Sequence, residues 1–562
     1  MKSITELPAA VITELEKNPE GAWQWFSQQY YGEQSKRGAD ELLVRVRERF
    51  HLEELIADCQ RYRLYAGKQG QEARYGLGIL CWALLLKYLM GWSYRKTSQE
   101  IGNNTQARWF VGYRLEQKTL SYVTLQRFEV WMNQNHPRLF FNEILKQIDE
   151  DFPDEAKQAQ VGDTFALLAN VGPQSRSEML RDACRRVLHY LEQVQAHAYA
   201  EVLHRLEHEA LFGSESDLPE FCLEKVQRDR LELRTALAAD GCFYWVWRQM
   251  AGLASQGTLE FLALERWLSI LDKLLRDEFV FEAGEEANTL SVRPCTEKER
   301  GSFVIGSTID PEATFRKHGE KNQLGYNVQV AASEHFVREI FAQTGATGDA
   351  SGVASLIAHQ KEELGLVPPK LIYDRAAGSP KIFHDVAQAS DGQTQLVARL
   401  IDHNKNSQRY GPLDFTLNED GSLTCPNGKT TSKFYRSQSA DGYNYRFSVE
   451  QCKECPLWKA CRGESEVAPT PITLPAAAEA TPLPAALDSP VSQPPASKRK
   501  LPKSTAYRQV FISRYRDLQR TAILYTKTEA FKTDMLFRST VEQKISALVR
   551  YNDARHAHAY GG

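Results

Sequence analysis

The first 150 residues carry apolar side chains at helical spacing. The clearest run contains Leu77, Leu80, Cys81, Leu84 and Leu85. Side chains three or four positions apart share one face of a helix. Proline, which interrupts helices, is absent between residues 40 and 136. The pattern therefore predicts an all-helical region over about residues 40–150.

Polar residues inside this region predict a helix-turn-helix. Ser93 can cap a short helix that ends near Ile101, and Thr105 can cap a second helix after a turn of glycine and asparagine. The second helix carries Arg108 and leads to Arg114, so it could enter a major groove with its cations. A plain packing hairpin gives the same pattern, and both interpretations stay open.

The periodicity changes after residue 160. Residues 161–169 form a short, apolar, strand-like segment, and a second helical stretch runs from residue 175 to about residue 282. Then follow strand-like runs at 303–307, 326–332 and 337–342, a helix at about 350–364, and strands at 370–373 and 395–399. This order predicts an α/β domain with a mixed sheet. The expected fold class is therefore multidomain, α plus α/β.

Four of the ten cysteines lie in one polar, glycine-containing region after Asp402. They are Cys425, Cys452, Cys455 and Cys461. A pair separated by two residues, with two more thiols nearby, has the spacing of a tetrahedral zinc site. Four thiolate ligands leave no open position, so zinc is predicted to be structural here. Free surface thiols are the alternative.

Composition and charge narrow the class of protein. Hydrophobic residues make up 42% and charged residues 25% of the 562-residue chain, as in globular proteins, and no stretch resembles a signal peptide or a membrane span. We expect a cytoplasmic protein without membrane contact. The net charge is -3, yet the segment from Lys498 to Gly562 holds fourteen Lys and Arg against five Asp and Glu. Such a segment can bind a polyanion or be a solvated tail.

Three carboxylates occupy positions suited to metal chemistry. Asp374 directly follows an apolar strand, and Asp163 lies within the strand-like segment 161–169, so both can face the crevice at a sheet edge. Glu542 lies in the region 507–551, which recovers helical periodicity. Oxygen ligands from two strands and a helix suit magnesium or manganese.

Taken in order, these segments resemble the DDE transposases of bacterial insertion sequences, in the group numbered eleven-eighty-two. The likeness runs from about residue 70 to the end of the chain. Its segments are Gly91-Trp92-Ser93-Tyr94-Arg95 with Arg108-Trp109-Phe110, Asp310-Pro311-Glu312-Ala313 with Gly325-Tyr326-Asn327-Val328-Gln329-Val330, Ile372-Tyr373-Asp374, and Arg538 with Val541 and Glu542. At the first aspartate, the order Val161-Gly162-Asp163-Thr164 differs from the family's more usual aspartate, glycine, threonine.

The resemblance implies a catalytic domain of the ribonuclease H-like, retroviral-integrase superfamily. Asp163, Asp374 and Glu542 would hold divalent magnesium or manganese ions and catalyse DNA strand cleavage and strand transfer at the ends of an insertion sequence. Arg538, one helical turn before Glu542, would hold that glutamate or contact a phosphate.

The implied partners are double-stranded DNA, both transposon ends and target, and further copies of the chain on that DNA. The predicted DNA contacts are Arg95, Arg108, Arg114 and Arg538. A bacterial cytoplasmic, nucleoid-associated location follows. Two alternatives stay open: a catalytically inactive, shortened, transposase-derived DNA-binding protein, and a ribonuclease H-like nuclease that cuts without joining.

The predicted domain division follows the changes in pattern. Residues 1–160 form the helical DNA-binding domain. The catalytic domain combines residues 161–172, 302–400 and 506–562. It is interrupted by a helical insertion at 173–301, the four-cysteine zinc insertion at 401–463, and a disordered linker rich in proline and alanine at 464–505.

Overall fold

The structure is a computed structural model in which the chain divides into two compact units. It describes residues 13, 17–18, 21, 42–62, 76–113, 118–213, 218, 220–253, 257–283, 290–318, 321–400, 410–438, 441–462, 508–552 and 554–557. The predicted linker at 464–505 and Arg114 lie outside these residues. The first unit comprises Met1–Gln158 with Gln360–Leu366, and the second comprises Ala159–His359 with Val367–Gly562.

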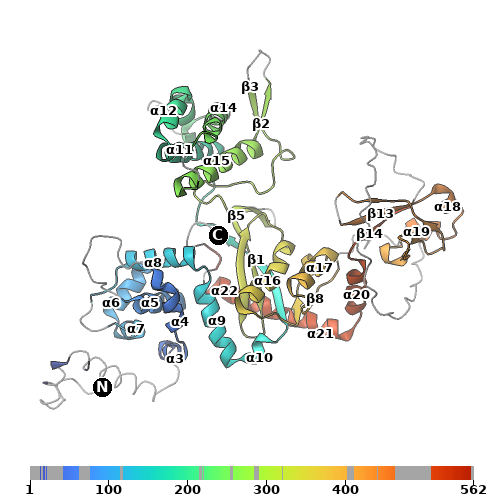
Figure 1. Cartoon of the computed structure of the whole chain (residues 1–562), viewed down its shortest axis with the longest axis horizontal. Coiled ribbons are helices and arrows are strands. Elements are labelled where there is room, and N and C mark those ends of the chain that lie inside the picture. The colour runs from blue at the N-terminus through green and yellow to red at the C-terminus, as the bar shows by residue number, and fades with distance from the viewer. Residues whose placement is uncertain are drawn as a thin grey trace. The chain divides into compact units, whose positions relative to one another are not determined.

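The described part of the first unit is almost entirely helical (Figure 1). Its helices are α3 (Leu42–Arg49), α4 (Glu53–Asp58), η2 (Cys59–Arg61), α5 (Leu77–Met90), α6 (Tyr94–Asn103), α7 (Thr105–Val111), α8 (Tyr122–Asn135), α9 (Leu139–Asp151) and α10 (Pro153–Ala156). The apolar helix α5 buries Leu80 and Leu84 against a core that includes Phe110 and Phe128. The predicted helical character of this region is confirmed. Within the described residues no single helix is both long and apolar enough to cross a membrane, and α5 and α6 pass that test only as a pair bent by 110°.

The capping of α6 and α7 confirms one prediction and corrects another. Ser93 caps α6, because its Oγ accepts the backbone N–H of Lys96 at 3.2 Å. The prediction that Thr105 caps the second helix is wrong. Asn104 does so, accepting the N–H groups of the second and third helical residues at 2.9 and 3.3 Å. Its amide oxygen reaches both donors, so α7 can begin with a single residue between it and α6.

A six-stranded mixed sheet forms the centre of the second unit. Its strands are β1 (Gln160–Leu168), β4 (Thr314–His318), β5 (Lys321–Ala332), β6 (Val337–Thr344), β7 (Lys370–Ile372) and β8 (Gln395–Val397). They lie in the order β4-β5-β1-β7-β8, with β6 also paired to β5. β1, β7 and β8 are parallel, whereas β5 is antiparallel to each strand that it pairs with. The predicted mixed sheet is confirmed.

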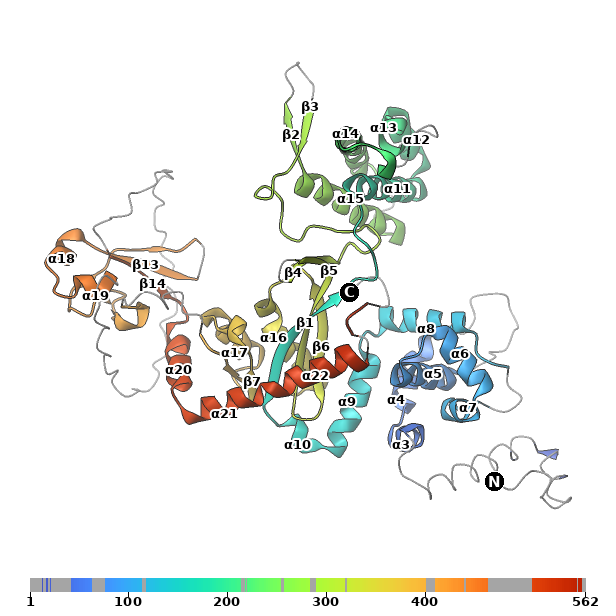
Figure 2. The same cartoon turned by 180° about the vertical axis from the view of Figure 1, so that it is seen from behind.

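Helices cover both faces of this sheet (Figures 1 and 2). On one face, the core contains residues of α16 (Val353–Leu364) and α17 (Pro380–Ala389). On the other, Val541 of α22 (Ser539–Tyr551) packs with Val161 and Val328. The helices α20 (Arg516–Thr526) and α21 (Glu529–Phe537) precede α22.

In the sequence, a helical bundle and a β-hairpin are inserted between β1 and β4. This insertion contains α11 (Arg176–Val194), α12 (Ala196–Arg205), α13 (His208–Phe212), η3 (Glu220–Cys222), α14 (Lys225–Met250), α15 (Leu259–Glu278), β2 (Phe279–Ala283) and β3 (Leu290–Pro294). The predicted strand at 303–307 is wrong: only Ile305 forms an isolated bridge, to Thr314. Phe303 has a φ of 64°, which is incompatible with an extended strand.

The four-cysteine region contains small strands and two short helices. They are η6 (Pro412–Asp414), β9 (Thr416–Leu417), β10 (Leu423–Thr424), β11 (Thr430–Thr431), β12 (Phe434–Arg436), β13 (Gly442–Phe447), α18 (Val449–Lys453) and α19 (Trp458–Arg462). β13 pairs with β14 (Arg508–Ser513). The helical prediction for 507–551 is therefore wrong over its first residues, where Val510 and Ile512 alternate into the core as in a strand.

Candidate active site

Two of the predicted carboxylates lie on adjacent strands, Asp163 inside β1 and Asp374 just beyond the end of β7. In the parallel pair of β1 and β7, Val161 is opposite Ile372. Asp163 and Asp374 each follow two residues later. Because side chains alternate between the faces of a strand, both aspartates belong to the face of Val161 and Ile372, which α22 covers.

Gly162 explains how β1 approaches the residue that follows β7. A Cβ added at Gly162 would lie 2.6 Å from the ring of Tyr373, a buried residue on the opposite face from the aspartates. Only glycine leaves room for that ring. The unusual glycine before Asp163 therefore has a packing reason in this chain.

The Asp163 carboxylate is held by the neighbouring backbone and by Arg538, the residue directly before α22. Its Oδ1 accepts the N–H of Thr164 at 2.8 Å, and its Oδ2 lies 3.4 Å from Nη2 of Arg538. Burial raises the pKa of Asp163, and the negative charge of Asp374 raises it further. The N–H of Thr164 and the Arg538 guanidinium act in the opposite direction without cancelling the increase.

Asp374 begins a short turn of helix. It is the cap of η5 (Arg375–Ala377), and its Oδ1 accepts the N–H of Ala376 at 2.8 Å. The N–H of Tyr373 bonds to the carbonyl of Val397, so pairing with β8 continues up to the aspartate. The carboxylate is therefore fixed to the backbone directly beyond the sheet edge.

The helix α22 brings the third predicted carboxylate toward the same face. Nη2 of Arg538 lies 3.7 Å from Oε1 of Glu542 as well as 3.4 Å from Asp163, so the arginine stands between the two acids. The Glu542 side chain is 60% exposed, against 20% for Asp163. Across the described part of the chain, no three His, Cys, Asp or Glu side chains are grouped closely enough to hold a metal ion. The metal sites stay predictions.

The four cysteines lie around one small cavity of about 30 Å³. The N–H of Lys429 donates to Sγ of Cys425 at 3.3 Å. Burial raises the pKa of Cys452 and of Cys461, and the neighbouring thiol of Cys455 raises both further. All four thiols are free and partly buried. The structure thus places the four predicted ligands on the walls of one cavity, although their thiols are not grouped closely enough to form a metal site.

The predicted DNA contacts have different surroundings. Arg95 is exposed on α6, with its guanidinium 5.1 Å from the ring centre of Tyr122. Arg108 is only 8% exposed, and its guanidinium lies 5.3 Å from the ring centre of Tyr113. α7 ends at Val111, so Arg114 lies beyond it and outside the described residues. Of the three described arginines, Arg95 is exposed, Arg538 is 30% exposed beside Asp163, and Arg108 is buried.

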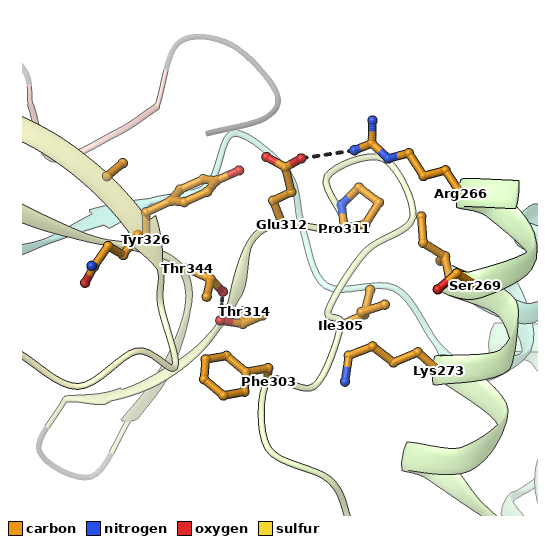
Figure 3. Close-up of a pocket in the computed structure, with 13 residues that line it drawn as sticks. Arg266, Ser269, Lys273, Phe303, Ile305, Pro311, Glu312, Thr314, Tyr326 and Thr344 are labelled. Atoms are coloured by element: carbon orange, nitrogen blue, oxygen red, sulfur yellow. Dashed lines mark hydrogen bonds and ion pairs between the residues drawn. The ribbon is translucent and has the colours of Figure 1, made fainter. Parts of the chain in front are cut away.

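A groove of about 620 Å³ lies between α15 and the β4–β6 side of the sheet (Figure 3). Arg266 reaches across it to Glu312, with Nη2 and Oε1 3.0 Å apart. Lys273, on the same wall, pairs with Asp277 at 2.5 Å. The cations of the groove are therefore paired within the chain, and none of the predicted catalytic or DNA-binding residues lines it.

Sequence reasoning assigned no role to a polar cluster on the opposite face of the sheet. It consists of Thr164, Arg316, Asn327, Gln329, Asp349 and Tyr373. The available signal was the alternation of polar Asn327 and Gln329 with apolar residues in β5, because polar side chains at every second position of a buried strand require partners.

The comparisons with known proteins point to one class. Residues 31–130 match the family described as a transposase domain (DUF772). The matched segment includes α3 to α7 and most of α8. This match supports a transposase-related function, and thereby an interaction with DNA. No curated protein matches the chain, and no solved structure matches it.

Proposed function

We propose that this chain is a DNA transposase of the DDE type that cleaves DNA strands and transfers them at insertion-sequence ends. The observation that carries the proposal is the placement of Asp163 inside β1 next to Asp374, which follows the end of the parallel strand β7, with Arg538 between Asp163 and Glu542. The transposase-domain match at residues 31–130 supports it independently. The mixed sheet with helices on both faces supports a ribonuclease H-like catalytic domain interrupted by the helical bundle and the cysteine region.

The three carboxylates have the chemistry that magnesium or manganese requires. Hard divalent cations prefer oxygen ligands. Each aspartate uses Oδ1 to accept a backbone N–H. Oδ2 of Asp374 is left for an ion, and Oδ2 of Asp163, 3.4 Å from Nη2 of Arg538, would bind the ion beside that arginine. Burial and the charge of Asp374 disfavour the ionised form of Asp163, as its raised pKa shows. A bound cation would relieve both costs. Glu542, being largely exposed, can turn toward the two aspartates.

Bound divalent ions would stabilise charge on the attacking and leaving oxygens of a phosphodiester. The residues of the chain orient that chemistry. Asp163 and Asp374 fix the position of the ligand oxygens through their backbone hydrogen bonds. Arg538 provides a positive charge beside them, to which a DNA phosphate can bind.

We further propose that the N-terminal helices and the basic C-terminal segment bind double-stranded DNA, and that several copies of the chain act together on it. The transposase-domain match lies over α6 and α7, where Arg95 is exposed. Arg95→Ala should weaken binding of transposon-end DNA about three- to tenfold and reduce the salt dependence by about one counterion. Arg108→Ala is the matched comparison and should mainly lower the unfolding temperature, because this side chain is buried. Affinity that does not change with salt would contradict the electrostatic part of the proposal.

We also propose that the four cysteines hold one structural zinc ion. Their location around one cavity supports this, as does the N–H of Lys429, which is directed at Cys425 Sγ and would stabilise a thiolate there.

In the decisive experiment, the purified full chain is incubated with magnesium ions, a DNA fragment that carries the insertion-sequence ends, and a target plasmid. Strand cleavage followed by joining is the expected result. Glu542→Gln and Asp374→Asn should each reduce cleavage on the order of 10³-fold or more while DNA binding is retained, since charge stabilisation is lost without a change of shape. Cleavage without joining would indicate a nuclease. DNA binding without cleavage would indicate an inactive DNA-binding protein.

A further inference from the structure

We infer that Asp349 is a positioning residue that fixes Asp163 and Asp374 from the opposite face of the sheet. Asp349 is the first residue of η4 (Asp349–Gly352), which follows β6. The inference rests on the proposed function in its consequence for metal binding, but its structural part can be tested separately.

The Asp349 carboxylate connects three strands through one oxygen. Its Oδ1 accepts hydrogen bonds from Oγ1 of Thr164 in β1, Nη2 of Arg316 in β4 and Nδ2 of Asn327 in β5, each at 2.9 Å. Arg316 also donates to Oδ1 of Asn327. An anion with a guanidinium partner and two neutral donors forms charge-assisted bonds, which are stronger than neutral ones. Oδ1 of Asp349 therefore holds the side chain of Thr164 and, through it, this position of β1.

The backbone carbonyl of Asp349 connects the fourth strand. It accepts Nε2 of Gln329 at 2.8 Å, and Oη of Tyr373 lies 3.4 Å away. Oη of Tyr373 donates to Oε1 of Gln329 at 2.8 Å. Asp349 and Gln329 thus hold the side chain of Tyr373, the residue directly after β7.

These anchored residues are the immediate neighbours of the two aspartates. Thr164 follows Asp163, and Tyr373 precedes Asp374. Since successive side chains of a strand point to opposite faces, fixing Thr164 and Tyr373 on one face fixes the direction of both carboxylates on the other. The N–H of Thr164 bonds to Asp163 Oδ1 as well, so this residue contacts both sides.

Mutation of a residue that orients a metal ligand usually lowers the metal affinity about ten- to a hundredfold. We therefore expect Thr164→Val, which removes the hydroxyl and keeps the shape, to weaken binding of manganese to the full chain by that factor. Thr164→Ser restores the hydroxyl and should bind within about twofold of wild type. Asp349→Asn should also weaken manganese binding, as Thr164→Val does.

Ser351→Ala is the matched control, because Ser351 lies in the same short helix and its Oγ donates only to the carbonyl of Gly348. The probe is Mn²⁺ alone, followed by the paramagnetic resonance signal of the free ion, well below the unfolding temperature of each variant. A second readout is hydrogen exchange of residues 160–168 and 370–377. These amides should exchange faster in Thr164→Val and Asp349→Asn than in the control.

Wild-type manganese affinity together with wild-type exchange in both variants would overturn the inference. A merely structural role would lower the unfolding temperature without changing manganese affinity, and that result would overturn it too. If Asp163→Asn and Asp374→Asn leave manganese binding unchanged, the proposed function fails. Hydrogen exchange then decides the positioning role alone: faster exchange supports it and unchanged exchange refutes it.

Discussion

The carboxylate face and the cysteine region are both candidate metal sites, and they are built in opposite ways. Asp163 and Asp374 come from distant parts of the chain and are placed by strand register and backbone hydrogen bonds within a large sheet. The cysteines lie close in sequence. Cys425 is in the turn between two-residue strands, and the other three lie in or between the five-residue helices α18 and α19. Short strands with few buried side chains supply little stability of their own. A metal ion at the carboxylate face would therefore take part in the reaction, whereas one in the cysteine region would stabilise the fold.

Removal of zinc should have the largest effect, and only on the cysteine region. Cys452→Ser, or chelation under reducing conditions, should unfold residues 410–462 and β14, because a structural zinc ion contributes on the order of 10 kcal/mol to folding. Zinc analysis and hydrogen exchange of β13 measure the effect. Cys222→Ser is the control, since this cysteine is exposed and distant in sequence from the cluster. A reduced, zinc-free protein with protected β13 would contradict the proposed site.

A substitution beneath the aspartates should have an intermediate effect on the sheet. Gly162→Ala places a methyl group against the Tyr373 ring and should lower the free energy of unfolding by about 1–3 kcal/mol, the usual cost of overpacking. Thermal unfolding measures it. Gly172→Ala is the control, because no atom lies within 4 Å of the added Cβ. Equal unfolding temperatures for the two variants would refute the tight contact between β1 and Tyr373.

The smallest expected effect comes from removing the charge of Asp163, and it raises the stability of the folded protein instead of lowering it. Because its pKa is raised in the folded chain, the folded state binds the proton more tightly than the unfolded state, and stability falls as pH rises through the folded pKa. In the absence of metal, Asp163→Asn should therefore stabilise the protein at neutral pH. The gain should shrink as pH falls through the raised pKa of folded Asp163, and it should be lost once the pH is below the ordinary aspartate pKa. Unfolding temperatures across pH test this, and a loss of stability at neutral pH would contradict it.

Local patterns in the sequence predicted much of the fold. The apolar runs predicted the strands β1 and β7 nearly at their observed bounds and a helix through the residues of α5, and the position of Asp374 after β7 followed directly. The hairpin of β2 and β3 was missed, because its exposed residues lack the alternation of a half-buried strand. Phe303 fails as a strand residue because its backbone is left-handed.

Properties that depend on tertiary contacts could not be predicted. Arg108 has the helical position of a DNA contact, yet its side chain is buried near Tyr113. Asp349 has no motif of its own, and its importance follows only from the three strands that its carboxylate joins. The convergence of Arg538 on Asp163 and Glu542 likewise depends on how α22 crosses the sheet.

The order of elements along the chain also has a consequence during translation. Asp163 and Asp374 leave the ribosome before the cysteine region, whereas Arg538 and Glu542 arrive with α22, after it. Domains generally fold as they are synthesised, from the N-terminus onward. A nascent chain that has not yet reached α22 therefore has its N-terminal helices and two aspartates but an incomplete carboxylate set. If the proposed chemistry needs all three carboxylates, this order delays it until almost the whole chain has been made.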